Sequence, residues 1–170
     1  MRRLGLAVLG IVTGVLPALA PVSAHAATCA QEKAIYRDRD NAYELAFAPV
    51  KSDAESNTHR FSLKVLGTTL SLDGYVTGST PVNRSNGILF FNCPDGDVTG
   101  KDIADCTIWQ GVVYGQSAGR LELLPAQGKD AADQILLPDL GPSIQQSKVF
   151  GEGKAKVAPW DLLDFKECAK

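Results

Sequence analysis

Apolar and polar positions alternate in short runs along this chain from about residue 34 to residue 150. Residues 61–65 alternate strictly, as expected for a strand with one buried and one solvated face. Residues 70–72 continue that pattern, and residues 74–78 indicate a turn and a further strand. The unbroken apolar run at residues 88–91 predicts a strand buried on both faces. Residues 107–114 are rich in β-branched and aromatic side chains and predict another strand.

Weaker signals complete the set of expected elements. Two short strands are expected at residues 120–124 and 134–137, each followed by a proline, and a last one at residues 148–150. An opening hairpin is expected from residues 35–36 and 43–47, which flank a charged turn at 37–40. An Asn-Gly turn at 83–87 and polar loops at 51–60 and 126–133 are also indicated. A helix is expected at residues 159–168, because this segment begins with proline and has a lysine near its end. The pattern predicts a mainly β fold: a single small antiparallel sandwich or barrel of about 7–9 strands with a short C-terminal helix.

The first 26 residues differ from the rest and have the three parts of a secretion signal. A positive start at Arg2 and Arg3 precedes an uncharged apolar stretch, and Ala24-His25-Ala26 follows as a cleavage site with small residues. We therefore expect a cleaved signal peptide at residues 1–26 and one β-rich domain at residues 27–170, located in the periplasm or secreted. No other apolar run approaches membrane length, so no membrane span is expected after cleavage.

Four cysteines remain in the expected mature chain, which suits an oxidising compartment and two disulfides. Four cysteines allow three pairings, and spacing favours Cys93 with Cys106 and Cys29 with Cys168. The first bond would close a local loop, and the second would join the two ends of the mature chain.

The charge of the mature chain argues against nucleic acid as a partner. Without the signal, 15 basic and 19 acidic residues remain, and they are interspersed along the sequence. Nucleic-acid binding needs a clustered basic face, which this distribution does not provide.

A possible serine nucleophile lies in the sequence Gly-Gln-Ser-Ala-Gly at residues 115–119. The motif works where a strand precedes Ser117 and a helix follows it. Here the following segment is short and ends at Pro125, and the one histidine of the mature chain, His59, lies in a stretch that indicates a polar surface loop. A hairpin turn is the preferred interpretation, and no catalytic or cofactor-binding residue is assigned.

The segment between Cys93 and Cys106 resembles part of a calcium loop. Asp95 and Asp97 occupy the first and third places, with Thr and Gly at the fifth and sixth, and oxygen ligands around a glycine turn suit a hard cation. The twelfth place, normally Glu, is Cys106. Asp95, Asp97 and Asp102 are the candidate calcium ligands, and a disulfide-closed loop with turn-forming residues is the alternative.

Three functions follow from these observations. The first is an exported, non-enzymatic binding domain that acts on an unknown protein or envelope ligand, supported by any exposed aromatic patch among Trp109, Tyr114 and Trp160. In size, compartment and disulfide use the chain is similar to the small periplasmic β-barrel inhibitors of cell-wall lytic enzymes, without a shared motif. The alternatives are a small hydrolase that uses carboxylates or Ser117, and a calcium-stabilised envelope protein.

Overall fold

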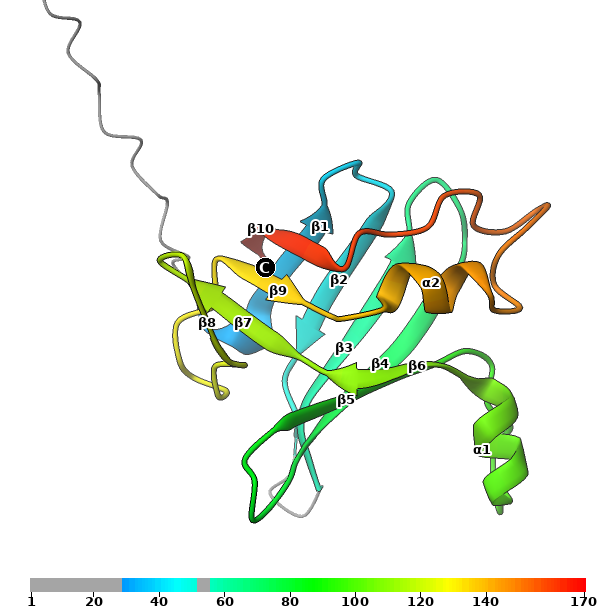
Figure 1. Ribbon diagram of the computed structural model, residues 1–170, viewed down its shortest axis with the longest axis horizontal. Helices are drawn as coiled ribbons and strands as arrows, with labels where there is room; N and C mark the ends of the chain where they lie inside the picture. Colours follow the sequence, from blue (N-terminus) through cyan, green and yellow to red (C-terminus); the bar gives the residue numbers. More distant parts are fainter. Residues whose placement is uncertain (1–28, 52–55) are drawn as a thin grey trace, which may run out of the picture.

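A computed structural model describes residues 29–51 and 56–170 of the chain. The expected signal peptide at residues 1–26 lies outside the described residues. Ten antiparallel strands form one curled half-barrel sheet, accompanied by two short α-helices (Figure 1). The elements in chain order are η1 (Gln31–Lys33), β1 (Ala34–Asp38), β2 (Tyr43–Ala48), β3 (Asn57–Val65), β4 (Ser71–Gly78), β5 (Ser85–Phe90), α1 (Gly100–Cys106), β6 (Thr107–Val112), β7 (Tyr114–Ser117), β8 (Arg120–Leu123), β9 (Gln134–Leu136), α2 (Leu140–Gln145) and β10 (Leu162–Cys168).

The order of the strands places the first strand in the middle of the sheet. That order is β6-β5-β4-β3-β2-β1-β10-β9-β7-β8, so β1 lies between β2 and the last strand, β10. Strands β1 to β6 form a meander in which each strand pairs with the next. Only Val113 separates β6, at one end of the sheet, from β7 near the other end, and its N–H donates to the carbonyl of Ser85. The sheet must therefore curl, because the single residue Val113 connects strands that lie near its two ends.

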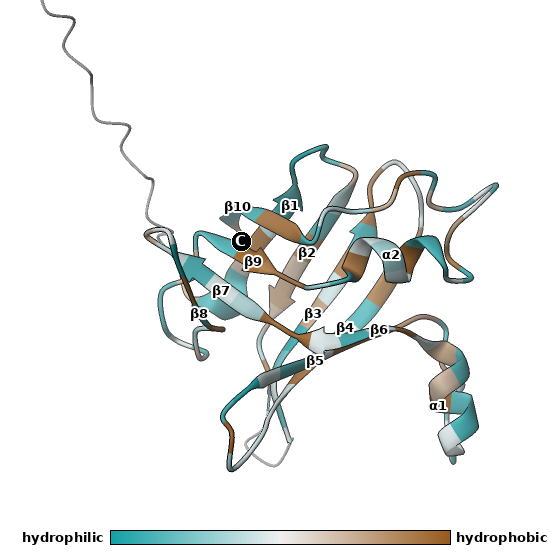
Figure 2. Cartoon of the chain, in the orientation of Figure 1, coloured by the Kyte–Doolittle hydropathy of each residue, from teal (hydrophilic) through white to brown (hydrophobic). Residues whose placement is uncertain are grey.

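The core fills the concave side of this sheet. Burial alternates along β1 and β2 with the period of two that a strand imposes on its side chains. Figure 2 shows the hydrophobic segments of the central strands, such as β2 and β10, in brown. Helix α2 covers the open side and contributes Leu140 and Ile144, both fully buried. The mainly β architecture is confirmed, with ten strands where about 7–9 were expected.

Trp109 occupies a space that two glycines leave open. Gly87 and Gly111 are cross-strand partners on β5 and β6 and face the indole ring. A Cβ on Gly87 would lie 2.5 Å from Cγ2 of Val113 and 2.9 Å from Cζ3 of Trp109. The indole N–H donates to the carbonyl of Pro138 at 2.8 Å, which ties β6 to the segment that leads into α2.

The expected helix at residues 159–168 is wrong, because this segment contains strand β10. Leu163 is fully buried while its neighbours Leu162 and Asp164 are exposed, which is the period of a strand. Pairing with β1 on one edge and β9 on the other outweighs the local helix signals.

Other local expectations also need correction. Residues 148–150 form no strand, although Phe150 makes an isolated bridge with Ala155. Asn86 and Gly87 lie inside β5 rather than in a turn, and the turn comes earlier, at residues 79–84. On strand β5 only Gly87 and Leu89 are buried, and the residues on the opposite face are partly exposed, so the strand is not buried on both faces as expected.

Both expected disulfides are present. Cys29 is bonded to Cys168 across 139 residues, with a Cα–Cα distance of 6.0 Å, beside the β1–β10 pair. Cys93 is bonded to Cys106 across 13 residues, with a Cα–Cα distance of 5.1 Å. Within the described ranges, neither helix is long and apolar enough to cross a membrane.

Removing the long-range disulfide should destabilise the fold more than removing the local one. In the chain-entropy model, Cys29→Ser with Cys168→Ser lowers the free energy of unfolding by about 4–5 kcal/mol, and Cys93→Ser with Cys106→Ser by about 3 kcal/mol. Denaturant titration of the two double variants measures both values. An equal or reversed order would contradict the role assigned to the Cys29–Cys168 bond.

Gly87→Ala should lower the free energy of unfolding by about 1–3 kcal/mol, because the added methyl overlaps Val113 and Trp109 in the core. Gly100→Ala is the matched control, since its methyl would meet no atom within 4 Å. Thermal or denaturant unfolding compares the stabilities of the two variants. Equal stabilities would contradict the prediction, because they would mean that the core accepts the added methyl group without loss of stability.

Candidate functional site

The segment between α2 and β10 separates two neighbouring surface pockets. Val157 lines both of them, and their volumes are about 570 and 590 Å³. This segment also carries two of the exposed large apolar side chains, Val157 and Trp160. Pocket and exposed apolar area therefore coincide along this segment.

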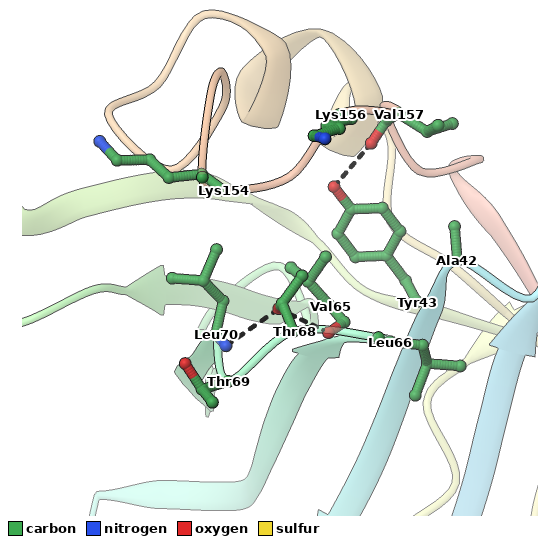
Figure 3. Close-up of a pocket in the computed structure, with 12 residues that line it drawn as sticks. Ala42, Tyr43, Val65, Leu66, Thr68, Thr69, Leu70, Lys154, Lys156 and Val157 are labelled. Atoms are coloured by element: carbon green, nitrogen blue, oxygen red, sulfur yellow. Dashed lines mark hydrogen bonds between the residues drawn. The ribbon is translucent and has the colours of Figure 1, made fainter.

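The first pocket lies between this segment and the β3–β4 turn (Figure 3). The hydroxyl of Tyr43 donates to the carbonyl of Val157 at 2.8 Å, and burial raises the pKa of Tyr43 to about 12. Tyr43 therefore remains a neutral donor that fastens the segment to the sheet. Lys154 extends away from Tyr43, and its ammonium donates to the carbonyl of Lys148. Lys156, the other lysine that lines this pocket, is drawn nearer to Tyr43 than Lys154 is.

The second pocket is lined mainly by apolar side chains. We call five of its apolar members the Trp160 surface: Leu136, Pro142, Val157, Trp160 and Leu162. Two carboxylates also line this pocket, and both are already hydrogen bonded. Asp161 accepts the N–H groups of Asp139 and Gly141 at 2.8 and 2.9 Å, next to the start of α2. The carboxylate of Asp40 accepts the indole N–H of Trp160.

Two residues of the β1–β2 turn hold Trp160 in place. The guanidinium carbon of Arg39 lies 3.4 Å from the ring centroid, and the indole N–H donates to Asp40 at 2.7 Å. Trp160 nevertheless remains 44% exposed. The turn itself is organised by Asp38, whose carboxylate accepts the N–H groups of Ala42 and Tyr43 at 2.8 and 2.9 Å. An exposed aromatic ring is thus fixed in orientation by a turn 120 residues away in sequence.

An apolar row continues from Trp160 across the convex face of the sheet. The register pairs Leu162 with Leu136, Leu136 with Tyr114 and Tyr114 with Leu123. Residues paired directly across antiparallel strands lie on the same face. Leu162 and Leu123 are exposed, and the two residues between them are half-buried. We call these four residues the apolar row.

His59 is not a surface residue of a loop, as expected, but a buried residue of β3. Only 4% of the residue is exposed, and it lies on the same inward face of β3 as Phe61 and Leu63. Its Nε2 lies 2.8 Å from the carbonyl of Pro125 and its Nδ1 lies 3.0 Å from the hydroxyl of Thr58. Because a carbonyl can only accept, Nε2 donates its proton there. Burial is the main cause that lowers the pKa of His59.

Ser117 lies at the end of β7, where a tight turn leads into β8. Ala118 and Gly119 both have positive φ angles, 49° and 75°, which is the geometry of a type I′ hairpin turn. A strand rather than a helix follows, so the serine lacks the strand–turn–helix setting of a nucleophile elbow. Both ring nitrogens of His59, the one histidine in the described part of the chain, are already hydrogen bonded to other groups.

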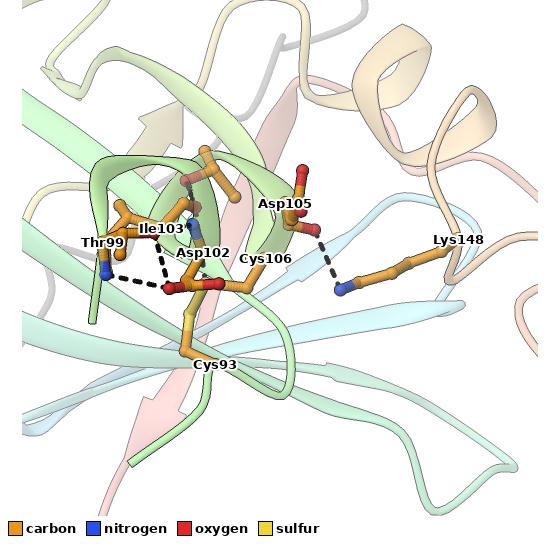
Figure 4. The surroundings of a disulfide bond; sticks show 8 residues. Cys93, Thr99, Asp102, Ile103, Asp105, Cys106 and Lys148 are labelled. Carbon is orange, nitrogen blue, oxygen red and sulfur yellow. Dashed lines mark hydrogen bonds between the residues drawn. A yellow bond between two sulfur atoms is a disulfide. The ribbon is translucent and has the colours of Figure 1, made fainter. Parts of the chain in front are cut away.

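The candidate calcium ligands are distributed over an exposed bend and a helix. Asp95 and Asp97 precede α1, and Asp102 lies in its first turn. The carboxylate of Asp102 accepts the N–H of Thr99 at 2.9 Å and its hydroxyl at 2.6 Å (Figure 4), and these bonds lower the pKa of Asp102. Among the described residues no group of three or more His, Cys, Asp or Glu side chains could hold a metal ion. The calcium site stays a prediction.

Of the three aromatic residues expected to form a patch, the structure exposes one. Trp109 is buried, Tyr114 is half-buried in the apolar row, and Trp160 is exposed. Arg39 and Asp40 belong to the charged turn expected at residues 37–40, and the sequence does not mark them as partners of Trp160. No local signal could have paired that turn with Trp160.

The buried histidine should make stability depend on pH. Because the folded state lowers the pKa of His59, its stabilising contribution is complete above the unfolded value, about 6.5, and is lost as the pH falls toward the lower folded value. Denaturant unfolding should therefore show stability falling from pH 7.5 to pH 5.5. His59→Gln should flatten that dependence, whatever its effect at pH 7.5. Equal slopes for the two proteins would contradict the prediction.

The geometry of the Trp160 surface and the apolar row is the basis for assigning a function. No family model, curated protein or solved structure matches the chain.

Proposed function

We propose that this protein is an exported, non-enzymatic binding domain that docks a protein partner on the Trp160 surface. The observation that carries the proposal is the exposed indole of Trp160, which Arg39 and Asp40 hold in one orientation. Trp and Arg are the residue types most enriched among binding hot spots. Here the two types are in direct contact at a solvent-exposed site.

Rigidity is what makes this surface suitable for binding. A side chain that is already ordered loses less conformational entropy when a partner covers it. The ring of Trp160 is stacked on one residue and hydrogen bonded to another, and Tyr43 fastens the preceding segment at Val157. The surface is therefore preorganised in the free protein.

The chemistry of the surface favours a protein over a small polar ligand. Small-molecule sites place a few available polar groups in an otherwise apolar pocket. Here the carboxylates of Asp40 and Asp161 are already occupied by protein N–H groups. Apart from Gln145 at its margin, the rest of the lining is mainly apolar and continues along the apolar row, which suits an apolar face on another protein.

Action outside the cytoplasm is part of the proposal. Two disulfides are typical of exported proteins, and the first 26 residues have the pattern of a secretion signal. An envelope protein or a cell-wall lytic enzyme is the expected partner.

Site-directed photo-crosslinking tests the proposal. The mature chain is prepared with a photoreactive amino acid in place of Gln145, which lines the second pocket, and irradiated in native envelope extract. A matched protein carries the probe at Val82, an exposed position in the β4–β5 turn. We expect a defined adduct from position 145 and none from position 82.

The purified partner then tests the role of Trp160. Trp160→Ala should weaken its binding about 30-fold or more, as for a hot-spot tryptophan, and Val82→Ala should leave it unchanged. Isothermal titration measures both affinities. Absence of an adduct from position 145, equal adducts from both positions, or unchanged affinity of Trp160→Ala would each overturn the proposal.

A further inference from the structure

The β7–β8 hairpin presents a free strand edge at the margin of the sheet, away from both helices (Figure 1). All four residues of β8 are exposed, including Leu121 at 53% and Leu123 at 37%. Among the strands that the structure describes, β8 pairs with β7 alone. Unpaired edges of this kind are templates for another strand, and natural proteins usually protect them with lysine, proline or a bulge.

The two-residue turn determines which backbone groups β8 offers. The pair that closes such a turn, Ser117 with Arg120, is a hydrogen-bonded pair, and hydrogen-bonded and non-hydrogen-bonded pairs then alternate. Leu121 and Leu123 therefore direct their N–H and C=O groups away from β7, toward the free edge. These are the groups that an incoming strand would meet.

The side chains of β8 are complementary to a second copy of the same strand. Around a two-fold axis at Leu121, the leucine lies opposite its own copy, and Arg120 lies opposite Glu122 of the other copy on both sides of the axis. Leu121 then forms a hydrogen-bonded pair, and the two charged pairs are non-hydrogen-bonded, the arrangement that brings opposed side chains closest. In the free protein Arg120 and Glu122 pair with each other at 3.0 Å, while both stay largely exposed.

The competing register is disfavoured by charge. A two-fold axis at Glu122 would place this carboxylate directly opposite its own copy, and like charges in that position are destabilising. The alternation Arg-Leu-Glu-Leu therefore selects the register centred on Leu121.

We propose that the protein self-associates by antiparallel pairing of β8 with β8 of a second copy, in the register centred on Leu121. The pairing extends the sheet across the two-fold axis and covers the most exposed apolar residue of the hairpin. The strand has four residues, so this contact is smaller than a standard stable interface and association depends on concentration.

Charge reversal in the mature chain provides the test. Sedimentation velocity over a concentration series should show reversible dimerisation of the unaltered protein. Arg120→Glu alone and Glu122→Arg alone should each weaken dimerisation about tenfold or more, because each places like charges opposite each other twice. The double variant R120E/E122R should dimerise like the unaltered protein.

A mixture of the two single variants is the decisive sample. One variant then carries two glutamates and the other two arginines, so the mixture should form heterodimers although neither variant dimerises well alone. Lys101→Glu and Asp105→Arg are the matched controls, because they break an exposed ion pair on α1 with the same changes of charge. Their dimerisation should be unchanged.

A monomer at every concentration would overturn the proposal and leave β8 open to a strand from another protein. Failure of the mixture to associate, or an equal loss in the α1 controls, would overturn it as well. None of these results depends on Trp160, so the proposed binding function would stand or fall separately.

Discussion

The structure depends on the pairing of its first strand with its last. β1 and β10 are neighbours at the centre of the sheet order, where the meander β2–β6 ends and the group β9, β7 and β8 begins. Among the described strands, their ladder is the one that joins these two halves, and Val113 joins them covalently at the opposite ends. The Cys29–Cys168 bond lies beside this ladder. Strand pairing and a covalent bond thus secure the same junction.

The Trp160 surface is a consequence of that junction. Trp160 lies two residues before β10, and Arg39 and Asp40 follow β1 directly. Pairing of the two strands therefore brings the indole to the β1–β2 turn, where stacking and a hydrogen bond fix it. The same strand order aligns Leu162 with Leu136 and so begins the apolar row. Scaffold and binding surface arise from one set of pairings.

Much of the fold could be predicted from the sequence, because one-sided burial leaves an alternating pattern in most strands. Residues 61–65 of β3 were predicted in this way, although β3 begins at Asn57, inside the expected loop at 51–60. The opening hairpin was predicted from the segments that flank the charged turn, and both disulfides from the spacing of the cysteines. The C-terminal strand was missed because its proline start and late lysine favour a helix, and only contacts with β1 and β9 decide otherwise. His59 was misjudged because its neighbours are polar, although its spacing from Phe61 and Leu63 places it on their face. For the binding site, the sequence indicated only that one or more of three aromatic residues could be exposed. The exposure of Trp160 and its contacts with the distant β1–β2 turn leave no local pattern in the sequence.

The central position of β1 has a consequence for how the chain folds as it is made. Its hydrogen-bonding partner β10 comes more than 120 residues later in the chain, so one edge of β1 stays open until residues 162–168 are available. Contacts this distant in sequence close slowly, and open edges in partly folded sheets promote aggregation. The sheet is therefore completed late in folding, and any factor that shields β1 in the meantime would raise the yield of native protein.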